Sequence, residues 1–174
     1  MNDTVMTVVA IFLAAVLMFI FPLMSTADRN DDIAQQVVQT ATTEFVDKVR
    51  ATGRLTQTEY DNFIQKISAT GNVFDVELEA QILDENSKKK TEATSSSKVG
   101  ENEYYSEYTS QILKTMAGDK KETYTLKEGD IFITTVKNQN KTISQILKNF
   151  FYRVTGNDTY NVAARHLGTV NVNG

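Results

Sequence analysis

The chain has 174 residues, a formal net charge of −4 and no cysteine. Its length suits one ordinary domain beside an N-terminal hydrophobic segment, and its mildly acidic balance argues against nucleic acid as a partner, because a phosphate-binding surface needs clustered Lys and Arg. The absence of cysteine excludes disulfides, thiolate metal sites and a cysteine nucleophile.

An apolar segment runs from Val5 to Met24 without a charged side chain. As a helix, its about 20 residues span roughly 30 Å, which is the thickness of the hydrocarbon core of a bilayer. We expect residues 1–27 to form a retained transmembrane or filament-core helix. Two alternatives stay open. A secretory signal peptide cleaved after Ala27 would need a basic region before a shorter apolar stretch, and a buried core helix would be shorter and have a polar face.

The surface of this helix is the candidate site for contacts with lipid and with copies of the chain. Ala10 and Ala14 are small enough to let neighbouring helices approach closely, although ordinary membrane-helix composition accounts for them equally well. Pro22 removes a backbone hydrogen bond, so it should kink the helix or mark its end at the membrane interface. The residues assigned to this surface are Val5, Val9, Ala10, Phe12, Leu13, Ala14, Leu17, Phe19, Ile20, Phe21 and Pro22.

After Ser25 the pattern becomes amphipathic, which predicts a helix over residues 28–52 that is continuous with the apolar one. Gly53 follows the basic Lys48 and Arg50, as is typical of a helix C-terminus and its cap. This helix should bury one stripe against the rest of a soluble head that comprises residues 28–174. The stripe consists of Ile33, Val37, Ala41, Phe45 and Val49.

The remaining head comprises residues 54–174. Its first part is predicted to contain two helices, a strand and a loop. Thr56 and Glu59 form a capping box that opens a short helix. Residues 73–82 alternate between apolar and polar side chains from Phe74 onward, which is typical of a half-buried strand. Residues 84–102 are almost entirely polar and should form an exposed loop. Apolar and tyrosine side chains near helical spacing then predict a second helix over residues 104–116.

The last part of the chain predicts two strands, an amphipathic helix and a terminal strand. Residues 124–136 are expected to form two short strands around a turn at 127–130, and residues 160–172 a terminal strand. The fold class is therefore α+β, with a long hydrophobic and then amphipathic helix packed on an antiparallel sheet of about four or five strands with short helices. The helix expected over residues 142–154 would have an apolar face of Ile143, Ile146, Leu147, Phe150 and Phe151.

The sequence contains no constellation of residues that would support catalysis. His166 is the only histidine. A metal site with several histidines is therefore excluded, and so is a Ser-His-Asp triad with a second histidine as a back-up base. Asp28, Asp31 and Asp32 suggest calcium at first sight, but they lack the glycine and the distant glutamate of an EF-hand loop. We therefore expect no enzymatic activity, no cofactor and no metal.

The order of these elements resembles type IV pilin-like proteins. More narrowly, it resembles the TadE-like pilins and pseudopilins of Gram-positive bacteria. The segment from Ile33 to Leu78 carries most of the resemblance, with an amphipathic helix that ends in FVDKVRATGR at residues 45–54, the sequence LTQTEY at residues 55–60, and a strand. The turn at Gly129 and Asp130 before an apolar strand fits the same pattern.

The resemblance implies a structural subunit of an extracellular or envelope-spanning filament. Its partners would be copies of itself through the N-terminal helix, the lipid bilayer before assembly, and other pilin-like subunits. Its location would be the cell membrane with an extracellular head, or a cell-surface filament. The alternative is a single-pass membrane-anchored binding module of a secretion, conjugation or pilus-assembly apparatus that does not polymerise.

The chain departs from the pilin pattern in two respects. The basic leader that prepilin peptidase reads does not precede the apolar segment here, and Val5 stands where pilins carry a glutamate. Asp3 is the only acidic residue nearby, which makes it the candidate for setting the register between subunits.

Overall fold

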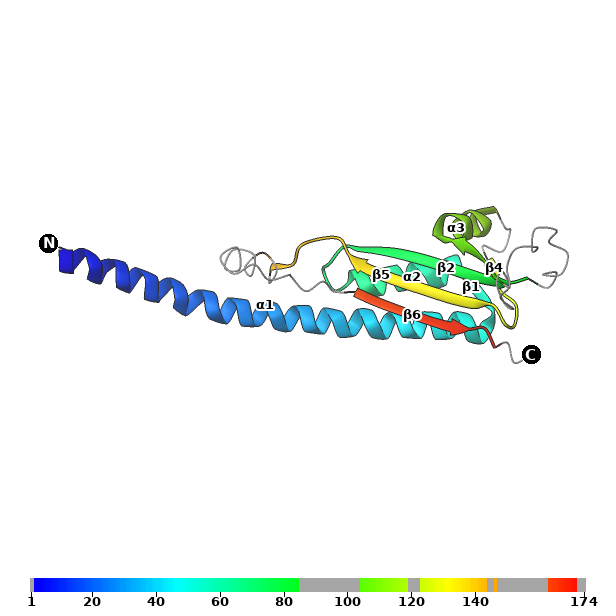
Figure 1. Ribbon diagram of the computed structural model, residues 1–174, viewed down its shortest axis with the longest axis horizontal. Helices are drawn as coiled ribbons and strands as arrows, with labels where there is room; N and C mark the ends of the chain where they lie inside the picture. The colour runs from blue at the N-terminus through cyan, green and yellow to red at the C-terminus, as the bar shows by residue number, and fades with distance from the viewer. Residues whose placement is uncertain (1, 85–103, 119–122, 144–145, 147–162, 172–174) are drawn as a thin grey trace, which may run out of the picture.

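A long helix and an antiparallel sheet dominate the structure, a computed structural model that describes residues 2–84, 104–118, 123–143, 146 and 163–171. Figure 1 shows the first half of the helix extending as a rod from a head that contains all the strands. The expected α+β fold is confirmed. The elements in chain order are α1 (Asn2–Thr52), β1 (Arg54–Thr56), α2 (Gln57–Ser68), β2 (Phe74–Leu83), β3 (Tyr104–Tyr108), α3 (Thr109–Gly118), β4 (Thr123–Thr125), β5 (Ile131–Asn138) and β6 (Ala163–Thr169).

The described strands form two antiparallel sheets. The larger has the strand order β3-β2-β5-β6, and the smaller pairs β1 with β4. Leu78 of β2 lies opposite Thr134 of β5, and both are buried. Side chains alternate across the strands, so the other face carries polar contacts such as the ion pair of Lys137 with Glu77 at 2.9 Å. One face of the larger sheet is therefore packed and the other faces solvent.

The second half of α1 covers the packed face together with α2 (Figure 1). Val38, Val46 and Val49 of α1 have no exposed surface. Phe45 stacks on Phe63 of α2 with ring centroids 4.4 Å apart, and its edge meets Phe132 of β5 at 6.0 Å. Burying a side chain of this size stabilises the fold by about 1.5–3 kcal/mol. The amphipathic half of α1 is thus a central part of the hydrophobic core from Val38 to Val49, whereas Ile33, expected in the buried stripe, is 52% exposed.

Polar contacts fasten α1 to both ends of β6. The Gln35 amide accepts a hydrogen bond from Ala163 N at 3.0 Å and donates one to Ala163 O at 2.6 Å. Arg50 Nε donates to Thr169 O at 3.2 Å. Gly168 leaves room for this arginine, because a Cβ atom there would lie 2.7 Å from Arg50 Cδ. These contacts fix the edge strand of the sheet to the helix.

Pro22 lies inside α1 without ending it. The helix continues to Thr52, and Figure 1 shows it gently bowed along its length. The Thr26 hydroxyl donates to Pro22 O at 2.9 Å. The alternative that Pro22 marks the end of the helix is therefore wrong. The predicted continuity of the apolar and amphipathic halves is confirmed.

The prediction of one helix over residues 104–116 is wrong for its first five residues. Tyr104 to Tyr108 form β3, which pairs with β2 in a register that places Tyr108 opposite Glu79. Tyrosine favours strands, and a neighbouring strand supplies the backbone partners that a helix would otherwise provide. The helix begins only at Thr109, whose hydroxyl accepts a hydrogen bond from Leu78 N at 2.7 Å.

The two strands predicted around residues 127–130 are present but do not pair with each other. β4 pairs with β1, whereas β5 pairs with β2 and β6. The turn between them is fixed by the buried carboxylate of Asp130, which accepts hydrogen bonds from Lys127 N at 2.7 Å and from Leu83 N at 2.9 Å. Gly129 adopts a φ of 92°, which favours glycine.

Several local predictions are confirmed. The capping box of Thr56 and Glu59 opens α2, Gly53 follows α1 with a φ of 62°, and the alternating segment forms β2. The terminal strand is present as β6. The polar loop expected over residues 84–102 lies outside the described residues except for its first, as does most of the helix expected over residues 142–154.

Replacing Gly168 with Ala should lower the free energy of unfolding by about 1–2 kcal/mol, because Arg50 must move and lose its hydrogen bond to Thr169. The measurement is urea unfolding of the detergent-solubilised chain followed by circular dichroism. The matched control is Gly118→Ala, where a Cβ atom meets nothing within 4 Å, so a change within about 0.5 kcal/mol is expected. Equal stability of the two variants would contradict the tight contact.

Candidate membrane and assembly surface

The first half of α1 extends beyond the head, and its large apolar side chains are exposed (Figure 1). Phe12 is 70% exposed, Met18 75% and Phe19 77%. A stretch of 18 residues in this helix reaches a mean hydropathy of 2.8, and none of it is buried. By length and composition the helix could cross a membrane. A signal sequence near the N-terminus would pass the same test.

The residues predicted for this surface all lie on α1 and surround it. Two of them, Leu17 and Ile20, are partly buried. An amphipathic helix buries one stripe against its own domain, but side chains on every side of a helix can be covered only by a surrounding medium or by other helices. The nine exposed residues are Val5, Val9, Ala10, Phe12, Leu13, Ala14, Phe19, Phe21 and Pro22.

Two threonine hydroxyl groups of the rod donate hydrogen bonds within the helix. Thr7 Oγ1 donates to Asp3 O at 2.8 Å, in the same way that Thr26 donates to Pro22 O. This i to i−4 bond lets a threonine sit in an apolar medium without an unpaired donor. Asp3 lies in the first turn of α1, where a carboxylate is favoured by the helix dipole. Its proposed role in subunit register stays a prediction.

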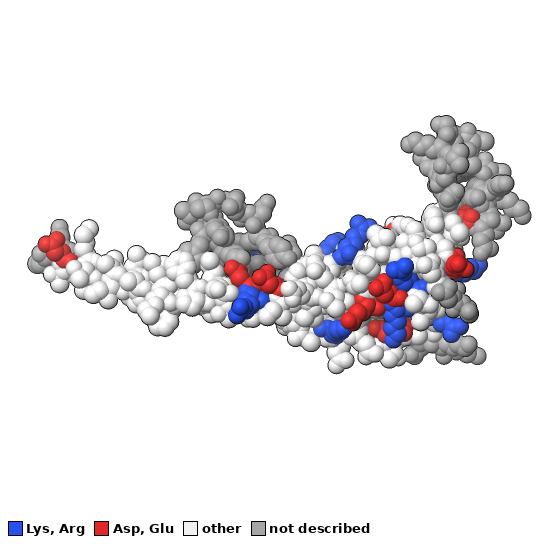
Figure 2. Space-filling model, turned by 90° about the horizontal axis from the view of Figure 1, so that it is seen from below, with Lys and Arg blue, Asp and Glu red and all other residues white. Residues whose placement is uncertain are grey.

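Charged residues begin abruptly where the rod reaches the head. Asp28, Arg29, Asp31 and Asp32 occupy just over one turn of α1. Figure 2 shows the rod as a white surface between a red patch at its tip and a cluster of red and blue residues beside the head. Since Asp28 follows Met24 by four residues, or about 6 Å of helix, this cluster marks the plane at which an apolar medium would end.

One acidic residue of this boundary, Asp31, binds the head. Asp31 Oδ2 accepts a hydrogen bond from Thr142 Oγ1 at 2.7 Å, and Thr142 is buried. Across the part of the chain that the structure describes, no group of three or more His, Cys, Asp or Glu could hold a metal ion. The contact instead fixes the chain after β5 beside the middle of α1.

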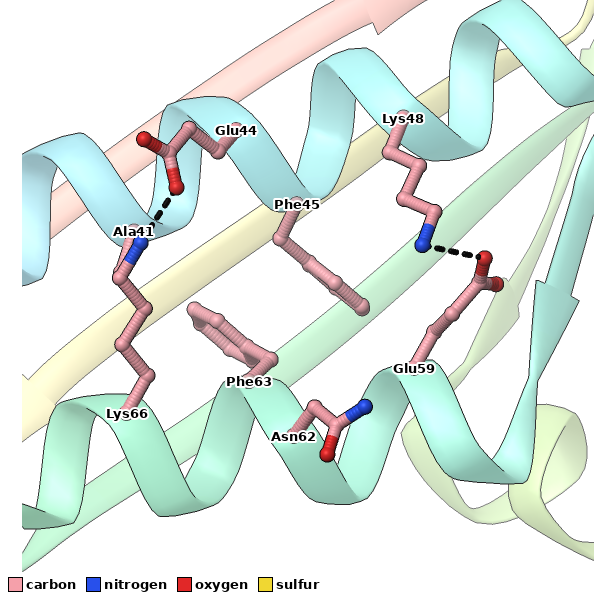
Figure 3. Close-up of a pocket in the computed structure, with 8 residues that line it drawn as sticks. All are labelled: Ala41, Glu44, Phe45, Lys48, Glu59, Asn62, Phe63 and Lys66. Carbon is pink, nitrogen blue, oxygen red and sulfur yellow. Dashed lines mark hydrogen bonds and ion pairs between the residues drawn. The ribbon is translucent and has the colours of Figure 1, made fainter.

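A groove of about 470 Å³, including its open mouth, lies between α1 and α2 in the head (Figure 3). Its floor is formed by the stacked rings of Phe45 and Phe63. Figure 3 shows an ion pair on each side of these rings, one between Lys48 and Glu59 at 3.0 Å and the other between Lys66 and Glu44. The remaining lining residues are Ala41 and Asn62.

Glu59 is the electrostatic centre of this groove. Besides Lys48, it contacts Thr56, whose backbone N donates to Glu59 Oε2 at 3.1 Å. Burial acts to raise the pKa of the Glu59 carboxyl, but the hydrogen bonds from Lys48 and Thr56 outweigh it and hold the pKa below its ordinary value. The groove is therefore a charge-balanced contact between two helices, in which the charged side chains are engaged with one another.

His166 lies in β6, as predicted, with its side chain 34% exposed. Its Nε2 atom is 3.6 Å from Asp47 Oδ1 on α1, and the same Asp47 oxygen accepts a hydrogen bond from Arg50 at 3.2 Å. Elsewhere in the core, Tyr124 donates its hydroxyl proton to Glu107 at 2.8 Å. Burial, and then this hydrogen bond, raise the pKa of Tyr124 far above its ordinary value. These pairs link structural elements to one another.

Comparisons of the chain with protein-family models, with curated proteins and with solved structures found no match. The resemblance to type IV pilin-like proteins therefore stays a prediction from the sequence. The structural features that bear on function are the exposed rod, its charged boundary and the packing of α1 in the head.

Sequence reasoning missed the residues that position the rod on the head. Gln35, Arg50 and Thr142 each bind a segment more than 100 residues away along the chain. Gln35 and Arg50 belong to the polar side of an amphipathic pattern, where most side chains only face water. No local signal distinguishes them, because the pattern reports burial and not the partner of a polar group.

Replacing Glu59 with Gln should destabilise the fold in a pH-dependent way. Because the pKa of Glu59 is lowered in the folded chain, its contribution is present above its ordinary pKa of 4.5 and is lost as the pH falls through the lower folded value. The stability difference between wild type and variant should therefore be largest near neutral pH and shrink in acid. Urea unfolding at several pH values measures it.

The matched control for this experiment is Glu44→Gln, which removes the other ion pair of the groove. Both side chains of that pair are at least half exposed, so its loss should change stability by no more than about 1 kcal/mol. A larger effect from Glu44→Gln than from Glu59→Gln would contradict the structural role assigned to Glu59.

Proposed function

We propose that the chain is a structural subunit of an extracellular or envelope-spanning filament, assembled through the first half of α1. The observation that carries the proposal is a rod with apolar side chains exposed on every side, built on the same helix that forms part of the core of the head. Such a rod needs lipid or other apolar helices around it. A head attached to its end is suited to form the outer surface of an assembly.

The size of the exposed surface supports this proposal. Eleven large apolar side chains between Val5 and Leu23 are more than half exposed. Leaving them in water would cost on the order of 20 kcal/mol relative to burial, which exceeds the net stability of an ordinary domain. The rod is therefore covered at every stage, by lipid before assembly and by identical rods after it.

The rod offers a place where copies of the chain can pack side by side. Ala10 and Ala14 lie one turn apart, so they form a small-residue strip where a neighbouring helix can approach. Contacts between different surfaces of identical subunits generate an open helical array unless their rotation closes a ring. In such an array the rods form the core, and the heads lie outside.

A membrane-anchored binding module that does not polymerise is the alternative function. The charged residues from Asp28 to Asp32 suit a helix that stays in the bilayer with its head above the surface. The two functions differ in one respect: a filament subunit takes its rod out of lipid, whereas an anchor never does. An assembly test therefore separates them.

Replacing Ala14 with Asp should abolish filament assembly, because a buried charge between packed rods costs several kcal/mol. The measurement is the amount of chain that shearing releases from cells and that pellets at high speed. Wild type should appear in this fraction, and Ala14→Asp should not.

Two control variants make the assembly test specific. Thr40→Asp adds the same charge on the same helix at an exposed position of its polar half, so it should leave assembly unchanged. Ala14→Leu stays compatible with lipid but fills the small-residue strip, so it should keep the chain in the membrane and weaken assembly. Filaments that form normally with Ala14→Asp, or a wild-type chain released only by detergent, would overturn the filament.

A further inference from the structure

We propose that the head has a second membrane contact, formed by Lys141, Ile143 and Ile146 after β5, which lies in the headgroup layer of the bilayer beside the rod. The proposed partner is the headgroup layer of a phospholipid bilayer. The inference rests on the proposed function in one point, namely that α1 sits in a bilayer before assembly.

The position of these residues along α1 supports the proposal. Thr142 is hydrogen-bonded to Asp31 at 2.7 Å, and Ile143 lines a hollow together with Ala27. Figure 1 shows the end of the described chain after β5 running alongside α1, away from the sheet and toward the rod. Ala27 follows Met24 by about 4.5 Å of helix, which lies within a headgroup layer about 5–7 Å thick on each side. Asp31, at about 10 Å, lies just beyond this layer on the side of the head.

The side chains of this segment are suited to an interface. Ile143 is 64% exposed and Ile146 55% exposed, although both are large and apolar. Ile146 N donates to Thr142 O at 3.0 Å, which is the bond of a helical turn, so residues 143 and 146 lie on one side of it. Lys141 is exposed beside them, and a lysine can keep its ammonium among headgroups while its stem stays in apolar surroundings.

The sequence that follows has the composition of an interfacial helix. From Lys141 to Gly156 there are three basic residues and no acidic one, in a chain whose net charge is −4. Basic residues on one face and large apolar residues on the other are typical of helices that lie in the plane of a membrane surface. Leu147, Phe150 and Phe151 continue the apolar pattern, but they lie outside the described residues and the proposal does not depend on their placement.

Lipid is a better candidate than a second copy of the chain for covering these side chains. They lie at the level where the apolar rod gives way to charged residues, so a bilayer around the rod would already reach them. A second copy would present its own Ile143 and Ile146 at this level together with Asp28, Asp31 and Asp32, and these carboxylates are not apolar partners for the isoleucines. Lipid headgroups with acyl chains beneath them supply both charge and apolar surface.

The absence of tryptophan from the chain permits a direct test. Ile146→Trp introduces a single tryptophan, which can be excited selectively at wavelengths longer than those that tyrosine absorbs, into the full-length protein reconstituted in vesicles of phosphatidylcholine and phosphatidylglycerol. Bromine atoms near the headgroup end of the acyl chains should lower its emission roughly twofold, and bromine atoms near the chain ends should lower it less, as expected for an interfacial depth. The control Leu167→Trp, at an exposed position of β6, should not be quenched.

A third variant, Phe12→Trp, separates the failure of this inference from the failure of the proposed function. Quenching of Phe12→Trp without quenching of Ile146→Trp would overturn the second membrane contact and leave the rod in the bilayer. Absence of quenching in both would show that the rod itself is not in lipid, which would overturn the membrane stage of the proposed function. Protection of Ile146→Trp from an aqueous quencher only after assembly would identify a second copy as the partner and overturn the lipid contact.

Discussion

The packing of the second half of α1 against the inner face of the four-stranded sheet supports the rest of the head. Val38 and Val49 are completely buried there, and Gln35 and Arg50 hold the edge strand at its two ends. Because the rod is the same helix, its direction relative to the head is set by core packing and not by a flexible linker. Close-packed cores resist deformation, so a displacement of the rod would be carried into the sheet.

The parts of this fold that the sequence predicts are those with a local cause. The charge-free segment from Val5 to Met24, the capping box at Thr56 and Glu59, and the alternation in β2 each depend on residues within one turn or one strand. The membrane-compatible length of the first half of α1 could be predicted for the same reason, since it depends only on the apolar character of consecutive residues. The end of α1 before Gly53 was also predicted correctly, because the left-handed conformation that favours glycine after a helix is a local requirement.

The parts that the sequence did not predict depend on partners far away in the chain. The side chains from Tyr104 to Tyr108 fit a helical spacing, but this segment forms a strand because its backbone hydrogen-bonds to β2. β4 pairs with β1 instead of β5. The turn residues between 127 and 130 predict a change of chain direction, but they do not show which strand each side pairs with. The contact between Asp31 and Thr142 at the boundary of the rod is of the same kind. A single sequence carries the propensity of each segment and not the identity of its partner.

The same apolar surface has different energetics in lipid and in water, and in the proposed filament this difference would determine when copies of the chain associate. In a bilayer, acyl chains are as apolar as Phe12, so association depends on close packing at small residues such as Ala14. Outside it, burial of the same side chains gains roughly 25 cal/mol per Å². Charged residues from Asp28 onward oppose deeper insertion, because each costs about 2.5–3.5 kcal/mol in hydrocarbon. A subunit would therefore remain dispersed at a fixed depth in the membrane and associate strongly only as its rod leaves the lipid.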